Sequence, residues 1–417
     1  MKYGLIGRTL AHSYSKEIHE ALGKYSYGLF SLEPEDLTDF ISARNFSGLN
    51  VTIPYKKDVI PLCDEVSDLA RAIGSVNTLY WKDHILVGHN TDYEGFLYTA
   101  KRSGISFAGK TVLIMGNGGT SLTARKAAAD EGAAKIYVTS RSAISDNTSR
   151  STDIPIKETT TAFVNITTIT YDDLPNITGD IDIIVNTTPV GTFPNNLQSI
   201  IDIADFPNCE AVIDVIYNPF KTKLLMDAEK AGLKTANGLP MLVAQATAAA
   251  GYFLGTPGAF ESENERIIEK MVNDMRNIVL IGMPGSGKTT IGKKLAEQTG
   301  KRFVDMDDMI IDKADKSIPE IFEEVGESGF RDIESQVAAE LGKQRGLVIA
   351  TGGGAVLRED NVYALKQNSL MIHIKRPLED LATDGRPLSK DMDTLRSMAA
   401  ERMPIYESLA EETIDNL

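Results

Sequence analysis

The feature that most constrains this chain is a glycine-rich loop at residues 282–289 (GMPGSGKT), directly after the apolar run 278–281 (IVLI). The loop has the length, the lysine and the threonine of a Walker A motif, and the apolar run predicts the buried strand that delivers it. Lys288 is expected to reach the β- and γ-phosphates of a nucleotide, and Thr289 to ligate Mg²⁺. The residues expected to hold ATP are Gly282, Gly285, Gly287, Lys288 and Thr289.

A carboxylate follows the next strand-like run, where residues 303–305 (FVD) end at Asp305. It is expected to hold the Mg²⁺ directly or through a water molecule, because hard cations prefer oxygen ligands. The plainer alternative is that Asp305 and Asp307 form the solvated acidic start of a helix.

A second glycine-rich turn, residues 116–119 (GNGG), follows the apolar run 112–115 (VLIM) and precedes a helix and the strand 135–139 (KIYVT). This βαβ order is typical of a dinucleotide-binding half-fold, so Gly116, Gly118 and Gly119 are cofactor-binding candidates. The third glycine position holds Ser121, which is off-pattern. The strand tip carries Arg141 in place of an acidic residue, which favours NADP over NAD, although a solvated surface arginine is the plain alternative.

Composition limits the remaining possibilities. A length of 417 residues predicts two or three domains of roughly 100 to 200 residues each. The net charge of −15 argues against a nucleic-acid partner. Two cysteines, Cys63 and Cys209, allow no disulfide framework or zinc motif, and no apolar run approaches the ~20 residues of a membrane span. We therefore expect a cytoplasmic protein with no membrane partner.

The first 260 residues or so resemble shikimate dehydrogenase through a series of motifs in the family's order. These motifs are Gly7 with residues 12–15 (HSYS), then 50–56 (NVTIPYK), 74–78 (GSVNT), 90–92 (NTD), 116–119 (GNGG), 186–191 (NTTPVG) and 241–245 (MLVAQ). The resemblance implies NADPH-dependent reduction of 3-dehydroshikimate to shikimate, with Lys56 and Asp92 as the catalytic pair. Reduction of a ketone leaves an alkoxide, so a positioned proton donor suits the chemistry.

The same resemblance implies a substrate site made of hydroxyl and amide groups. Ser13 and Ser15 would hold the substrate carboxylate, and Thr52, Asn77 and Gln245 would contact the ring. Two serines favour shikimate over quinate among the relatives. Taken alone, Ser-x-Ser is an ordinary turn signal, Lys56 a solvated lysine and Asp92 a helix N-cap.

Residues from about 276 to 417 resemble shikimate kinase. The motifs are the phosphate loop and residues 305–307 (DMD), 329–334 (GFRDIE), 351–356 (TGGGAV), 385–388 (GRPL) and 402–406 (RMPIY). The resemblance implies that Asp307 orients and helps deprotonate the attacking hydroxyl, and that Arg386 stabilises the transferring phosphate. It also implies that the shikimate carboxylate is held by Arg331, by Arg402 and by the backbone of Gly353 and Gly354. Arg331 and Glu334 are three residues apart on an expected helix, so they either face one pocket or pair on its surface.

Four departures from the family patterns carry expectations of their own. Lys16 stands where the dehydrogenases usually have proline and Tyr93 where they have glycine, which predicts an altered loop near the substrate. The kinase lid is short and lacks an additional arginine, and the chain stops soon after Tyr406. A weakened kinase with reduced ATP affinity is therefore expected.

The predicted fold class is α/β, in four parts. Residues 1–98 and 238–260 form an α/β substrate domain, 99–237 a Rossmann-like NADP domain, 261–275 a helical linker and 276–417 a P-loop kinase domain with a parallel sheet. The predicted function is a bifunctional enzyme that makes shikimate and then phosphorylates it, with 3-dehydroshikimate and shikimate as its small-molecule partners. The alternative is an active shikimate or quinate dehydrogenase whose kinase part only senses nucleotide.

Overall fold

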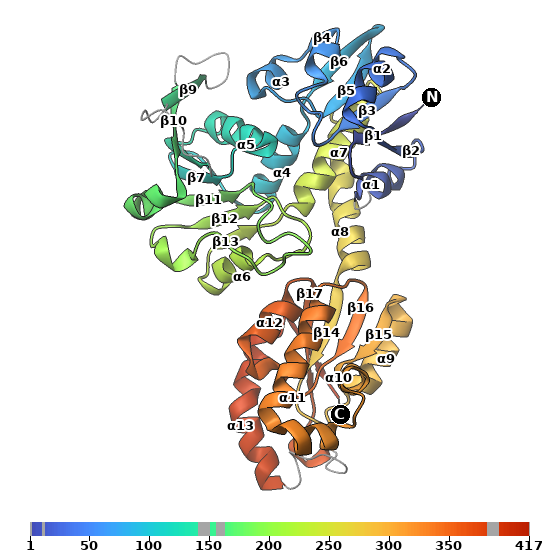
Figure 1. Cartoon of the computed structure of the whole chain (residues 1–417), viewed down its shortest axis with the longest axis vertical. Helices are drawn as coiled ribbons and strands as arrows, with labels where there is room; N and C mark the ends of the chain where they lie inside the picture. The colour runs from blue at the N-terminus through green and yellow to red at the C-terminus, as the bar shows by residue number, and fades with distance from the viewer. Residues whose placement is uncertain (1, 11–12, 141–150, 156–162, 382–391, 417) are drawn as a thin grey trace. The chain divides into compact units, whose positions relative to one another are not determined.

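The computed structural model describes residues 2–10, 13–140, 151–155, 163–381 and 392–416. The chain forms two compact units with separate hydrophobic cores (Figure 1). The first unit comprises Met1–Val190, Ser199–Phe220 and Asp227–Lys270, and the second comprises Gly191–Gln198, Lys221–Met226 and Met271–Leu417. The four-part division drawn from the sequence stays a prediction.

The first lobe of unit one is a six-stranded mixed sheet in the order β2-β1-β3-β5-β6-β4. Its strands are β1 (Tyr3–Gly7), β2 (Tyr27–Ser31), β3 (Gly48–Val51), β4 (Glu65–Val66), β5 (Thr78–Lys82) and β6 (Ile85–His89), and its helices are α1 (Ser15–Ala21), α2 (Leu37–Ser42) and α3 (Asp68–Ile73). Ile6, Leu49 and Leu79 are fully buried in its core. Two strand ends matter for function, because β3 runs into the loop that holds Lys56 and β6 leads to Asp92.

The second lobe is a seven-stranded sheet in the order β13-β12-β11-β7-β8-β10-β9. Its strands are β7 (Thr111–Met115), β8 (Lys135–Thr139), β9 (Ser151–Pro155), β10 (Phe163–Ile169), β11 (Ile183–Asn186), β12 (Ala211–Asp214) and β13 (Lys234–Ala236). All pairs are parallel except β9 with β10. The expected βαβ unit is therefore present, and the parallel strands β11, β12 and β13 extend its sheet beyond β7.

Helix α5 (Gly119–Asp130) fills the βαβ unit between β7 and β8. Ala124, Ala127 and Ala128 are fully buried, because small side chains let the helix approach the sheet closely. Gly116, at the end of β7, has φ of 103°, and a Cβ there would lie 2.9 Å from Oγ1 of Thr187. Both observations require glycine at this turn.

Helices α4 (Asp92–Arg102) and α7 (Leu239–Phe253) pack side by side and join the two lobes of unit one (Figure 1). Helix α4 also contacts α5 of the second lobe, whereas α7 contacts α1 and β5 of the first. A Cβ at Gly95 would lie 2.6 Å from the carbonyl oxygen of Met241, so the close packing of the two helices depends on that glycine. Helix α7 is rich in alanine, and Pro240 lies in its first turn.

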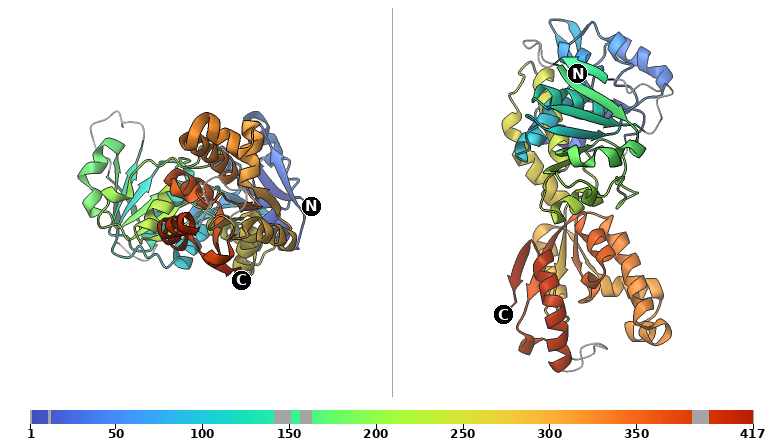
Figure 2. Two further views of the ribbon diagram at one scale, coloured as in Figure 1. Left: turned by 90° about the horizontal axis from the view of Figure 1, so that it is seen from below. Right: turned by 90° about the vertical axis from the view of Figure 1, so that its left-hand side faces the viewer.

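Unit two is a five-stranded parallel sheet in the order β15-β16-β14-β17-β18. Its strands are β14 (Asn277–Ile281), β15 (Arg302–Asp305), β16 (Leu347–Ala350), β17 (Ser369–Lys375) and β18 (Glu412–Asp415). The edge strand β18 is the dark red arrow beside the C label in the right-hand view of Figure 2. The phosphate-loop strand β14 is central, with β16 on one side and β17 on the other.

The helices of unit two cover both faces of its sheet. Helix α9 (Lys288–Thr299) packs its Ala296 on one face, and the opposite face carries a larger core with residues from the other helices. Those helices are α10 (Met306–Ala314), α11 (Ile318–Gly342), α12 (Glu359–Lys366) and α13 (Met392–Leu409), and α11 kinks at Gly326. Two further helices are α6 (Lys223–Lys230) and α8 (Asn264–Met275). Among the described residues, no helix combines the length and apolarity needed to cross a bilayer.

Acid is expected to destabilise the first lobe through His19. Burial lowers the pKa of this fully buried imidazole to about 3, from 6.5 in a peptide. Between these values the unfolded chain binds a proton that the folded chain excludes, so folding stability falls as pH drops below about 6.5, by ~1.4 kcal/mol per pH unit. Trp81, the only tryptophan of the chain, lies in β5 and reports unfolding of this sheet by fluorescence.

The matched variant is His19→Phe, which keeps a flat ring stacked on Tyr27, where the two ring centroids now lie 4.0 Å apart. The urea concentration at the unfolding midpoint is followed through the fluorescence of Trp81 at several pH values. As pH falls, this midpoint is expected to drop more steeply in the parent chain than in the variant. Equal slopes from about pH 7 to pH 4 would show that His19 contributes nothing to acid sensitivity.

Candidate active sites

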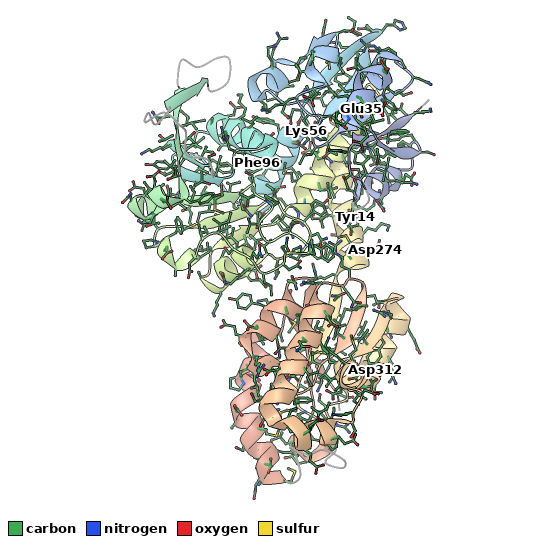
Figure 3. All side chains as sticks on the ribbon, viewed as in Figure 1. Tyr14, Glu35, Lys56, Phe96, Asp274 and Asp312 are labelled. Carbon is green, nitrogen blue, oxygen red and sulfur yellow. The ribbon has the colours of Figure 1, made fainter. Side chains whose placement is uncertain are left out.

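Lys56 and Asp92 meet at the wall of a cavity of about 350 Å³ in unit one. Lys56, labelled in Figure 3, extends from the loop after β3, and its Nζ lies 2.5 Å from Oδ2 of Asp92. The two side chains are 19% and 12% exposed. Asp92 is the first residue of α4, where the positive end of the helix dipole favours a carboxylate. The plain interpretations of a solvated lysine and a helix N-cap therefore do not describe this pair.

Asn77 holds the carboxylate of Asp92 in place. Its Nδ2 donates to Oδ1 of Asp92 at 2.8 Å, and its own Oδ1 accepts from the backbone N–H of Thr91 at 2.7 Å. The hydroxyl of Thr78 donates to the same Oδ1 at 2.9 Å. Asn77 also lines the cavity, so the structure adds a positioning contact to the ring contact expected from the sequence.

The other predicted substrate residues line the same cavity. These residues are Ser13, Ser15, Thr52 and Gln245. The hydroxyl of Ser13 donates to that of Ser15 at 3.1 Å, so two hydroxyl groups are held together on one wall. Gln245 comes from α7, where its Nε2 donates to the carbonyl of Leu242 at 2.9 Å. The cavity is thus ringed by hydroxyl and amide groups with one ammonium–carboxylate pair.

The two residues that depart from the dehydrogenase pattern lie away from this cavity. Tyr93 donates its hydroxyl to Asp130 of α5 at 2.7 Å, and Lys16 is exposed on α1. Neither residue lines the cavity. Sequence reasoning missed Tyr217, which lines the cavity from the loop after β12. Its signal was its place just beyond the carboxyl end of a parallel strand, where ligands bind in such sheets.

The glycine turn of the second lobe has the properties of a phosphate cradle. Gly118 has φ of −89°, and a Cβ there would meet nothing within 4 Å. Neither backbone conformation nor packing requires glycine at this position, so its absence of a side chain leaves room for a bound group over the start of α5. The residues therefore fit a dinucleotide, whose pyrophosphate suits a helix N-terminus.

Arg125 is a cation beside this turn that the sequence reasoning missed. Its guanidinium donates to Oδ1 of Asn117 at 2.5 Å and to the hydroxyl of Ser121 at 3.2 Å. Burial lowers the pKa of Arg125 to about 10. Ser121, which stands at the third glycine position, is fully buried and accepts a hydrogen bond from Arg125. Arg141 lies outside the described residues.

The phosphate loop of unit two opens a second cavity of about 570 Å³. The positive φ values of Gly282, Gly285 and Gly287 form its curved backbone. Lys288 is buried, and its Nζ donates to the carbonyl oxygens of Gly282 and Met283 at 2.8 and 2.9 Å. The buried hydroxyl of Ser286 has no hydrogen-bond partner among the described residues. A loop with an unsatisfied donor, a lysine and curved backbone fits a polyphosphate.

Thr289 and Asp305 bring two oxygen ligands together beside the loop. The hydroxyl of Thr289 donates to Oδ2 of Asp305 at 2.8 Å, and Oδ1 of Asp305 accepts the backbone N–H of Asp307 at 3.1 Å. Asp305 is therefore a helix N-cap and a candidate magnesium ligand at once. Among the described residues no three His, Cys, Asp or Glu side chains gather into a metal cluster.

The carboxylate-binding candidates of the kinase lie on the far wall of this cavity. Nη1 of Arg331 donates to Oε2 of Glu334 at 2.8 Å, and the side chains are 9% and 1% exposed, so the pair faces the pocket rather than the surface. Burial raises the pKa of Glu334, and the positive charge of Arg331 opposes that rise. Arg402 is also buried, and its Nε has no hydrogen-bond partner in the part of the chain that the structure describes.

The glycine triplet after β16 packs directly against these charged groups. A Cβ at Gly354 would lie 2.3 Å from Nη2 of Arg331, and one at Gly352 would lie 3.1 Å from Oδ1 of Asp307. The carbonyl of Gly353 accepts the Tyr406 hydroxyl at 2.5 Å. Asp307, Arg331, Arg402 and both predicted glycines thus line one cavity with the phosphate loop. Arg386 and most of the lid lie outside the described residues.

Comparison with known proteins names the two halves. The shikimate dehydrogenase substrate binding domain model matches residues 5–79, and the shikimate kinase model matches residues 284–417. Over 252 residues the chain is 36% identical to shikimate dehydrogenase (NADP(+)) of Clostridium beijerinckii, which covers 58% of this chain and 88% of that protein. The chain belongs to the shikimate dehydrogenase family. It is an enzyme that carries a shikimate kinase domain after its dehydrogenase part.

Solved structures of the family share the fold of the dehydrogenase part. Shikimate dehydrogenase 1 from Peptoclostridium difficile is 32% identical with a TM-score of 0.56, over 65% of this chain and 98% of that one. Quinate dehydrogenase from Corynebacterium glutamicum in complex with NAD is 26% identical with a TM-score of 0.54, over 65% and 98%. The predicted α/β class is confirmed, and the expected NADP(H), ATP and Mg²⁺ agree with the relatives and the kinase model.

Proposed function

We propose that this chain reduces 3-dehydroshikimate to shikimate with NADPH and then phosphorylates the 3-hydroxyl of shikimate with ATP. The observation that carries the first half is the contact between Lys56 and Asp92 on the wall of a cavity that also holds the Ser13–Ser15 pair. The two serine hydroxyls could therefore hold the substrate carboxylate while Lys56 serves as the proton donor to the same small substrate. The second half is supported by Arg331 and Arg402 facing the phosphate loop across one cavity.

In the reductase, Lys56 supplies the proton that the reduced carbonyl oxygen needs. A bound NADPH would supply the hydride for the new C–H bond, which leaves the electron pair of the C=O π bond on oxygen. The ammonium of Lys56 gives its proton to that oxygen, and the hydrogen bond to Asp92 holds the ammonium at the wall of the cavity. Lys56 regains its proton from solvent, so the pair returns to its starting state. Asn77 fixes Asp92 and thereby the donor.

In the kinase, Asp307 orients the substrate hydroxyl and accepts its proton. Arg331 and Arg402 hold the substrate carboxylate, since guanidinium groups donate to a carboxylate in a matched fork. Thr289 and Asp305 would hold Mg²⁺, which neutralises phosphate charge when bound. Lys288 would exchange its carbonyl partners for phosphate oxygens.

The substrate class is tested by comparing shikimate and quinate oxidation with NADP⁺ and NAD⁺. The likeness to a quinate dehydrogenase makes quinate the competing substrate. We expect kcat/KM for shikimate to exceed that for quinate by at least tenfold. Faster oxidation of quinate would contradict the proposed first step.

Gly118→Ala is expected to weaken cofactor binding without harm to the fold. The new methyl meets no protein atom within 4 Å and the backbone φ is ordinary, so unfolding free energy should change by less than about 0.5 kcal/mol. The methyl fills the space left over the helix start, so KM for NADPH should rise at least tenfold. Steady-state reduction at varied NADPH measures this.

Gly179→Ala is the matched control, because this exposed glycine also meets nothing within 4 Å. It should leave KM for NADPH within twofold of the parent. An unchanged KM in Gly118→Ala would remove the glycine turn from the cofactor site.

A further inference from the structure

The kinase cavity holds a cation that no role above uses. Arg376 lines it together with Pro284, Gly285 and Lys288 of the phosphate loop. Arg376 is half-buried and makes no hydrogen bond or ion pair with any residue that the structure describes. Arg331 of the same cavity, by contrast, forms ion pairs with Glu334 at 2.8 Å and with Glu327 at 3.3 Å.

The sheet fixes where Arg376 stands. It directly follows β17, which pairs with the phosphate-loop strand β14 so that His373 lies opposite Ile281. Beyond this pair β14 turns into the phosphate loop and β17 ends at Lys375, and Arg376 then lines the same cavity as Pro284 of the loop. The contact is tight, because a Cβ at Gly282 would lie 2.5 Å from the carbonyl oxygen of Ile374. A strand end in a parallel sheet therefore presents this guanidinium at the edge where ligands bind.

Charge and chemistry then indicate what Arg376 binds. Phosphoryl transfer gathers negative charge on the oxygens of the moving group, and arginines placed at those oxygens speed it strongly. Arg376 stands at the end of a strand and lines the cavity together with the phosphate loop, where phosphates would bind.

We propose that Arg376 is a catalytic residue of the kinase, whose guanidinium contacts the transferring phosphoryl group from the end of β17. The inference rests on the proposed kinase function. In the step, the bond from the γ-phosphorus to the bridging oxygen of ATP breaks and its electron pair leaves with ADP. The bond to the substrate oxygen forms, and the hydroxyl proton passes to Asp307. Arg376 neither gains nor loses a proton.

The test uses the full chain with Arg376→Gln, Arg376→Lys and the control Lys375→Gln. Lys375 is the exposed neighbour that ends β17 and does not line the cavity. Removal of Arg376 is expected to lower kcat for phosphate transfer about 100-fold, as loss of one transition-state donor does. KM for shikimate should stay within threefold, and lysine should restore only part of kcat because it lacks the planar fork. Lys375→Gln should match the parent.

An unchanged KM for shikimate in the kinase assay shows that unit two is folded, and dehydrogenase activity shows the same for unit one. An Arg376→Gln chain with at least a third of the parent's kcat would overturn the inference while leaving the kinase function standing. A raised KM for shikimate at unchanged kcat would also overturn it, because it would place Arg376 at the substrate carboxylate. A parent chain that transfers no phosphate would contradict the proposed kinase function itself, and the inference with it.

Discussion

Replacing Lys56 by Met is expected to lower kcat for 3-dehydroshikimate reduction by about 10²–10⁴-fold, the usual contribution of a positioned acid. The methionine fills a similar volume, and Asp92 keeps its hydrogen bond from Asn77, so the fold should survive. Cofactor binding should change little, because the glycine turn lies on the other lobe. Steady-state NADPH oxidation and a fluorescence titration with NADPH measure the two effects separately.

Lys57→Met is the control, since Lys57 is the exposed neighbour and does not line the cavity. Its activity should match the parent. A Lys56→Met chain that keeps more than about a tenth of kcat, a loss below ~1.4 kcal/mol in the barrier, would remove Lys56 from proton transfer.

Replacing Lys288 by Met is expected to lower phosphate transfer at least 100-fold and to leave 3-dehydroshikimate reduction unchanged. The lysine is the buried cation of the phosphate loop, and its charge meets the phosphates where negative charge grows. The same protein sample thus carries its own control in the reductase assay. Phosphate transfer is followed by ADP release in the presence of shikimate.

Lys294→Met is the matched variant, an exposed lysine on the same helix α9. It should keep the activity of the parent. Phosphate transfer that survives in Lys288→Met would remove Lys288 from the transfer step. Phosphate transfer already absent from the parent chain would favour the alternative of a kinase part that only senses nucleotide.

Local patterns predicted most of the fold. Strand β8 has the predicted bounds, 135–139, and the apolar runs 112–115 and 278–281 lie in the strands β7 and β14. Strand order could not be predicted, because pairing between strands far apart in sequence depends on tertiary packing.

Site residues could be predicted where a sequence motif identifies them, and less well where only tertiary contacts bring a side chain into the site. Lys56 and Asp92 came from separate motifs, and only the fold shows that their side chains touch. The Arg331–Glu334 spacing fitted either a pocket or a surface, and burial against the glycine triplet decides for the pocket. Arg125 and Arg376 were missed, because a lone arginine carries no signal until the fold sets it beside a glycine loop.

A coupled reaction on the intact chain tests the bifunctional proposal most directly. The chain is supplied with 3-dehydroshikimate, NADPH, ATP and Mg²⁺, and shikimate 3-phosphate is measured against NADPH consumed. We expect the two to approach a one-to-one ratio, with the phosphorylated product lost in both Lys56→Met and Lys288→Met. Shikimate that accumulates in the parent without any phosphorylated product would contradict the proposal.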